Sequence, residues 1–134
     1  MRTDHKRTKR RRTGERGDVT VQAIMIVPLA LLLIFAIVQF AVAWYAKAAL
    51  TAAAEDGLRY AQTNPTQPAE AVTEASARSN AGFVTDLTVT SNRPGPGRLT
   101  VTVRGHVPAA FPGFTWSITG NATGSLELFR PQGQ

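Results

Sequence analysis

The stretch from Val19 to Ala46, VTVQAIMIVPLALLLIFAIVQFAVAWYA, contains 28 residues and no charged side chain. As a helix rising about 1.5 Å per residue it would be about 42 Å long, which exceeds the roughly 30 Å hydrocarbon core of a bilayer. Its most apolar part runs from Ala23 to Ala43, and Trp44 and Tyr45 near its end are typical of a membrane interface. The sequence therefore predicts one transmembrane helix over residues 19–46.

The distribution of charge predicts the orientation of this helix. Residues 1–18 contain eight Lys or Arg and three acidic residues, whereas residues 19–134 contain seven and six. Because Lys and Arg are retained on the cytoplasmic side, residues 1–18 are predicted to be a basic cytoplasmic tail, with the C-terminal domain extracytoplasmic. The protein is thus expected in the cell membrane as a single-pass protein. Most of the excess charge lies in this tail, which favours the lipid bilayer over nucleic acid as a partner.

A cleaved secretory signal is the alternative explanation of the apolar stretch. Ala41, Val42 and Ala43 offer small residues for a cleavage site. A signal peptide, however, has an apolar region of about 7 to 15 residues, and the run here has the length of an anchor.

Residues 47–134 are predicted to form one small external α+β domain, which without cysteine must fold without disulfides. The alanine-rich segment 47–62 continues the first helix and places four apolar residues on one face, namely Leu50, Ala54, Leu58 and Ala61. A second helix is expected over residues 69–80, after a segment with two prolines.

Three strands should follow, because the apolar period changes from helical to two. They are predicted over residues 84–92, 99–107 and 116–129, with a long tip between the first two strands of an antiparallel sheet. Gly120 and Gly124 in the third strand predict a bulge or bend. The fold class is therefore α+β, with a single N-terminal transmembrane helix that extends into an external domain.

Several motifs along the first helix resemble one family. Glu15–Ala23, ERGDVTVQA, is followed by Pro28, by the rest of the apolar run and by Ala52–Ala61, AAAEDGLRYA. This pattern is similar to that of TadE-like minor pilins or pseudopilins of bacterial tight-adherence pilus systems. These share a glycine before the helix, an early proline and an A-x-x-G-x-R-x-A stretch. The similarity covers about residues 15–62 and implies a pilin-like fold.

The resemblance implies a non-enzymatic part in the assembly of such a pilus, or of a related envelope or secretion apparatus. Other pilus or secretion-system subunits would be the partners, and a prepilin peptidase would cleave after Gly17, so that Asp18 becomes the N-terminus. Gln22 would then be the fifth residue, where the family usually has a glutamate that neutralises a neighbouring subunit's terminal amine. From the residues alone, Gly17 is a linker before an Asp18 N-cap, and Gln22 is a polar residue at the interface.

Two residues inside the apolar run are candidates for helix assembly. Pro28 is expected either to kink the helix toward a partner or to be tolerated, with its freed carbonyl satisfied locally. Gln39 is expected either to form a hydrogen bond across a pair of helices or to meet water near the outer leaflet.

The sequence predicts no catalytic residue, no cofactor and no metal site, and hence a protein that is not an enzyme. Its two histidines, His5 and His106, are expected on opposite sides of the membrane, and metal-ligand spacings and a Gly-x-Ser-x-Gly turn are absent from the sequence. The alternative function is a stand-alone binding domain, anchored by one helix or secreted, without a role in a pilus.

Overall fold

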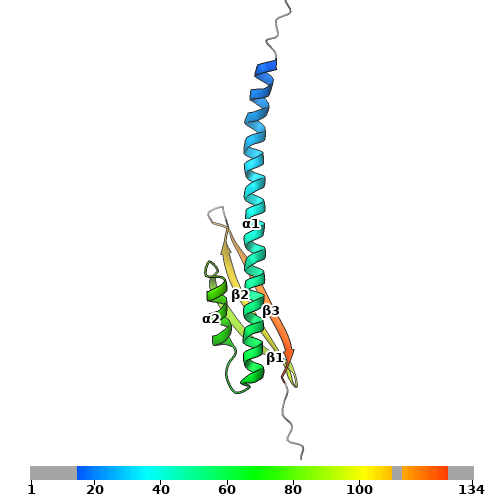
Figure 1. The fold of residues 1–134 in the computed structure, drawn as a ribbon, viewed down its shortest axis with the longest axis vertical. Coiled ribbons are helices and arrows are strands. Elements are labelled where there is room, and N and C mark those ends of the chain that lie inside the picture. Colours follow the sequence, from blue (N-terminus) through cyan, green and yellow to red (C-terminus); the bar gives the residue numbers. More distant parts are fainter. Residues whose placement is uncertain (1–14, 110–112, 127–134) are drawn as a thin grey trace, which may run out of the picture. The chain divides into compact units, whose positions relative to one another are not determined.

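The computed structural model describes residues 15–109 and 113–126 and has two helices and a sheet in this part (Figure 1). The elements, in chain order, are α1 (Glu15–Thr63), α2 (Glu70–Asn80), β1 (Thr85–Gly95), β2 (Arg98–Pro108) and β3 (Thr115–Ser125). The predicted α+β, pilin-like fold class is confirmed. The chain divides into two compact units, Met1–Ala36 and Ile37–Gln134, and the second unit is called the folded domain below.

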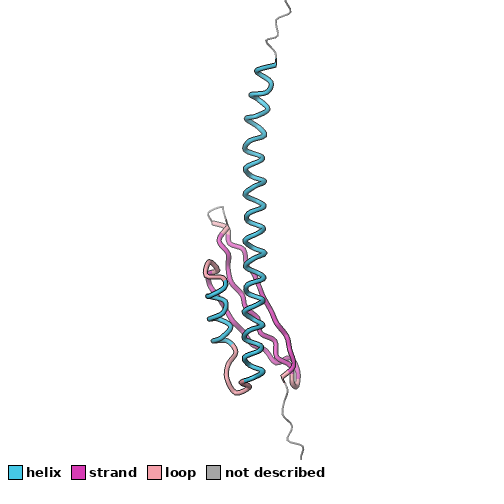
Figure 2. Tube along the Cα trace, in the orientation of Figure 1, coloured by secondary structure: helices cyan, strands magenta, loops and turns pink. Residues whose placement is uncertain are grey.

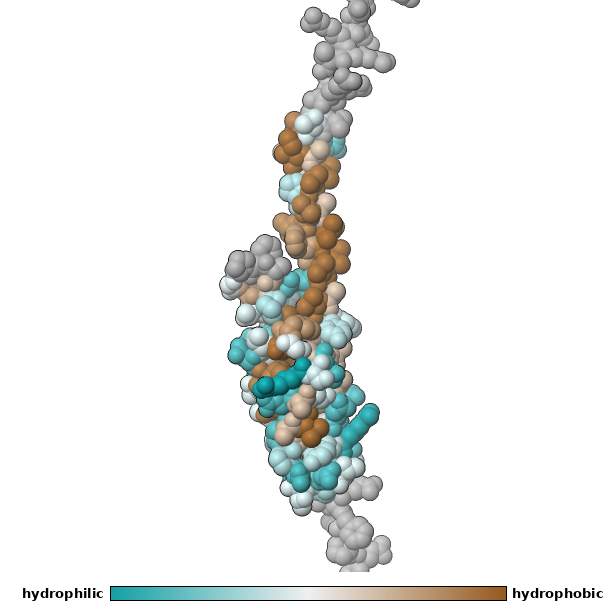
Figure 3. Space-filling model, turned by 60° about the vertical axis from the view of Figure 1, so that its left-hand side comes forward, coloured by the Kyte–Doolittle hydropathy of each residue, from teal (hydrophilic) through white to brown (hydrophobic). Residues whose placement is uncertain are grey.

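The first part of α1 is an apolar helix with an exposed surface. Its large apolar side chains from Val21 to Phe40 are all at least 51% exposed, and Figure 3 shows this surface in brown. Among the described residues, one helix is long and apolar enough to cross a membrane, and it lies within α1 at Thr20–Thr63. Because water does not favour so much exposed apolar surface, this part of α1 has the properties of a membrane anchor.

The later part of α1 belongs to the folded domain and buries one face there. The predicted stripe of Leu50, Ala54, Leu58 and Ala61 is confirmed, since each of these side chains is at most 8% exposed. The core continues into the sheet through the alternating apolar residues of β2, which are Leu99, Val101, Val103 and Val107. Burying these residues provides the hydrophobic stabilisation of the domain.

The three strands form one sheet (Figure 2), which has the order β1-β2-β3 and is antiparallel throughout. The predicted long tip between its first two strands is wrong. Gly95 pairs with Arg98, so the tip consists of Pro96 and Gly97, and the glycine supplies the positive φ of 72° that such a tight turn requires. Both strands are therefore longer than the predicted 84–92 and 99–107. The predicted end of the third strand, residues 127–129, lies outside the described residues.

The predicted bulge at Gly120 and Gly124 is also wrong, because β2 and β3 pair without a shift from Arg98↔Ser125 to Pro108↔Thr115. Instead, both glycines let α1 approach the sheet. A Cβ on Gly120 would lie 2.5 Å from the carbonyl carbon of Leu50, and one on Gly124 would lie 2.9 Å from Leu58 Cδ2. Their function in the fold is close packing between a strand and a helix.

Helix α2 packs on α1 through another glycine. A Cβ on Gly57 would lie 1.7 Å from Oγ1 of the buried Thr73. Beside this contact, Ser76 Oγ donates a hydrogen bond of 2.6 Å to Asp56 Oδ2. The glycine of the A-x-x-G-x-R-x-A stretch therefore marks the point where the two helices meet.

Candidate interaction surface

The described residues include few groups that could carry catalysis. No group of three or more His, Cys, Asp or Glu side chains gathers among them at a distance suited to a metal ion. His106 is half-buried on β2, and its Nδ1 lies 4.0 Å from Asp86 Oδ2. The surfaces of α1 and of the sheet are consequently the features to consider for function.

The residues of the predicted processing site lie in the first turns of α1. Because α1 begins at Glu15, Gly17 and Asp18 are within the helix, and the alternative of a linker glycine before an Asp18 N-cap is wrong. Gln22 follows one turn later with an exposed side chain. The helix also continues through Pro28, so this proline is accommodated inside α1.

Gln39 has a use that the sequence did not indicate. Its Nε2 donates a hydrogen bond of 3.3 Å to the carbonyl oxygen of Pro108, at the end of β2. The two residues are 69 positions apart in the chain, and no local pattern relates residues at such a separation. The amide thus connects α1 to the sheet within one chain.

Around Gln39 the folded domain carries an apolar surface, which we call the apolar collar (Val38, Phe40, Val42, Phe83 and Trp116). On one flank of α1 the rings of Phe40 and Trp116 meet edge to face, with centroids 6.5 Å apart. On the other flank, Val38, Val42, Phe83 and Val107 help to line a groove of about 570 Å³. The collar is an aromatic-rich surface at one end of the domain.

The two edges of the sheet differ in how open they are to pairing. Edge strand β1 contains Arg93 and Pro94 and has two register irregularities, between Thr85 and Thr88 and between Asn92 and Gly95. Such features disfavour pairing with a further strand. Edge strand β3 pairs regularly over 11 residues, TWSITGNATGS, and contains neither a charge nor a proline. Among the described residues, β3 is therefore the edge more open to another strand.

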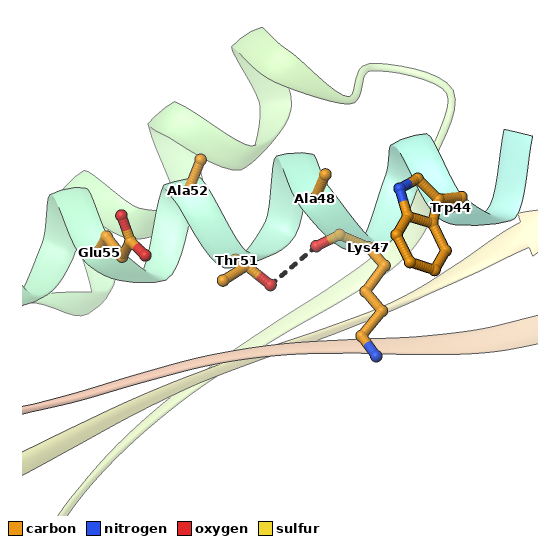
Figure 4. A pocket seen from close by; sticks show the side chains of 6 residues that line it. All are labelled: Trp44, Lys47, Ala48, Thr51, Ala52 and Glu55. Carbon is orange, nitrogen blue, oxygen red and sulfur yellow. Dashed lines mark hydrogen bonds between the residues drawn. The ribbon is translucent and has the colours of Figure 1, made fainter. Parts of the chain in front are cut away.

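A face of α1 runs along this open edge. At one end Phe40 contacts Trp116 of β3, and at the other Gln62 Nε2 donates a hydrogen bond of 3.0 Å to the carbonyl oxygen of Ser125. Between them lies a groove of about 370 Å³ on α1 (Figure 4), which is lined by Trp44, Lys47, Ala48, Thr51, Ala52 and Glu55.

Lys47 and Thr51 lie on the side of this groove that faces the strands, whereas Ala48 and Ala52 point away from them (Figure 4). Trp44 is 73% exposed at the end of the groove. A strand added to β3 would therefore lie beside Lys47 and Thr51 of α1, and the bulky ring of Trp44 lies at one end of the groove.

Comparisons with curated proteins and with solved structures gave no match to this chain. A family model described as TadE-like protein, in contrast, matches residues 17–59. The matched residues include the apolar run of α1 and Gly57, where α2 packs. This match confirms the resemblance drawn from the sequence: residues 17–59, about a third of the chain, match the TadE-like protein family.

Proposed function

We propose that the protein is a non-enzymatic, membrane-anchored minor pilin or pseudopilin that takes part in assembling a tight-adherence type pilus or a related envelope or secretion apparatus. The observation that carries this proposal is the family match, which falls on α1. The first part of α1 is the anchor, and the basic residues 1–18 keep its N-terminus in the cytoplasm. The folded domain then lies outside the cytoplasm, where pilus subunits meet.

The open edge of β3 is the surface of the domain that we assign to partner subunits. An unpaired edge offers backbone N–H and C=O groups, which a strand of another protein can pair with. β3 carries no charged side chain that would repel such a strand, and from Thr119 to Ser125 its side chains are small or polar. α1 and β3 together then contact the assembly, the helix in the membrane and the strand outside it.

The test is the number of pili on cells that lack the chromosomal copy and express either the wild-type protein or an edge variant. In the variant Thr119→Lys/Asn121→Lys, two lysines stand on β3, and we expect the loss of pili. The matched control is Thr88→Lys/Thr90→Lys on β1, because these residues occupy the same rows of the sheet through Arg104 and Thr102. We expect this control to restore pili.

The amount of each variant in the membrane fraction is measured in parallel, so that lost protein is not mistaken for lost assembly. If deletion of the gene leaves the number of pili unchanged, the protein is not part of the pilus pathway and the proposed function is wrong. If pili disappear on deletion but both lysine variants restore them, the pilus function stands and the assignment of the β3 edge is wrong.

A further inference from the structure

We propose that the apolar collar is seated in the membrane, at the boundary between the hydrocarbon core and the headgroups of the leaflet on the domain's side. The proposal rests on the membrane anchoring of α1 in the proposed function, and it adds a second lipid-binding surface contributed by the sheet. The bilayer thus contacts β2 and β3 directly, in addition to the anchor helix.

The length of the apolar run supports this position. A bilayer core needs about 20 helical residues, and 20 residues counted from Thr20, just after the charged Asp18, end at Gln39. The uncharged run nevertheless continues to Ala46, before Lys47. The folded domain already contacts α1 where this continuation begins, because Val38 lines the groove and Gln39 is bonded to Pro108. The collar is therefore at the level where the hydrocarbon core ends.

The composition of the collar matches that level. Its members Phe40 and Trp116 are 67% and 41% exposed, and Trp44, one turn beyond Phe40 on α1, is 73% exposed. Aromatic side chains are enriched at membrane interfaces, because their rings are apolar and the ring N–H of tryptophan can reach polar groups. Acyl chains of the lipid would fill the groove beside Val42 and Phe83. In water the same surface would leave these side chains in contact with solvent.

The hydrogen bonds at this end of the sheet fit a membrane surface as well. A backbone group that enters an apolar phase needs an internal partner. The carbonyl of Pro108 accepts from Gln39 Nε2, and the N–H of Ala109 donates to the carbonyl of Phe114 over 3.1 Å. Gln39 thus supplies the donor that allows the end of β2 to lie at the edge of the hydrocarbon core.

The protein's two tryptophans, Trp44 and Trp116, allow a direct test. The full chain is reconstituted in phosphatidylcholine vesicles with and without lipids brominated in the upper part of the acyl chains. In Trp44→Phe, the brominated lipids should reduce the fluorescence of the remaining Trp116 about twofold relative to unbrominated vesicles, as expected of a ring at the hydrocarbon boundary. In Trp116→Phe, the remaining Trp44 should be quenched no more strongly, because Phe40, which contacts Trp116, precedes Trp44 by one turn.

The control is Tyr60→Trp in a chain that carries both phenylalanine substitutions. Its single tryptophan lies near the other end of the domain, and no quenching is expected there. If Trp116 is not quenched and its emission maximum lies at the longer wavelength of a ring in water, the proposal is overturned. If Trp116 is not quenched but its emission maximum lies at shorter wavelength, the proposal is also overturned, because a protein surface such as a second copy would then cover the collar. In either case, extraction of the membranes with alkaline carbonate tests the anchor separately. If the protein stays in the membrane, α1 is still an anchor and the proposed function stands.

Discussion

Glycines decide how closely the elements of the domain pack at the scale of single residues. At Gly120 an added Cβ would lie 2.5 Å from two backbone atoms of α1, the Leu50 carbonyl carbon and the Thr51 nitrogen. Backbone atoms of a helix cannot rotate away, so Gly120→Ala should lower the free energy of unfolding by about 3 kcal/mol, at the upper end for overpacking. Urea unfolding of the full chain in detergent micelles measures this loss.

Gly95→Ala is the matched control, because a Cβ at Gly95 would have no atom within 4 Å and its φ is not positive. We expect its unfolding free energy to stay within about 0.5 kcal/mol of the wild type. Equal stability of Gly120→Ala and the wild type would mean that α1 does not lie on β3 as described.

Gly57 provides a second prediction at this scale. Gly57→Ala should destabilise the domain by about 1 to 3 kcal/mol, because the new Cβ collides with Thr73 Oγ1. Thr73→Ala removes that oxygen, although Ala69 O would still lie 3.2 Å from the new Cβ. The double variant should therefore lose less stability than the sum of the two single variants, as measured in a double-mutant cycle. Strict additivity would contradict the contact between α1 and α2.

At the scale of whole elements, helix α1 contains a proline, Pro28, within its apolar part. α1 continues through this proline, so we expect it to be tolerated inside the helix rather than required as a kink. Pro28→Ala should leave both the amount of protein in the membrane and the number of pili unchanged. Fewer pili at an unchanged membrane level would instead show that the proline adapts α1 to a partner helix.

The elements themselves could be predicted from local sequence, and their contacts could not. The period of Leu50, Ala54 and Leu58 identified the buried face of α1 correctly, because helical periodicity is a local property. The meaning of Gly120 was missed, because a glycine that accommodates a helix has the same sequence signal as one that forms a bulge. The bond from Gln39 to Pro108 was missed because it joins elements that are distant in the chain.

The orientation of the whole molecule can be tested because the chain has no cysteine of its own. Single cysteines introduced at Thr8 in the basic tail and at Asn92 on β1 report on the two sides of the membrane. We expect a membrane-impermeant maleimide to label Asn92→Cys in cells with a permeable outer envelope, and Thr8→Cys only after the inner membrane is opened. The reverse pattern would contradict a cytoplasmic N-terminus.

Processing by a prepilin peptidase also concerns the molecule as a whole, because it would remove the basic tail. The family resemblance predicts cleavage after Gly17, and we expect the intact mass of protein from host membranes to correspond to a chain that starts at Asp18. The new terminal amine would then be four residues from Gln22, which has no negative charge. An unpaired ammonium buried in an apolar assembly costs several kcal/mol.

Gln22→Glu should therefore increase the amount of protein that co-assembles into pili, whereas the uncharged control Gln22→Leu should not. The increase should require cleavage, because in an uncleaved chain the amine remains at Met1 and the carboxylate has no ammonium to neutralise. A full-length mass in the membrane would contradict processing while leaving α1 as an unprocessed anchor. A chain found in the medium that starts near Trp44 would instead identify a secreted protein, for which the charge at position 22 has no effect on the mature molecule.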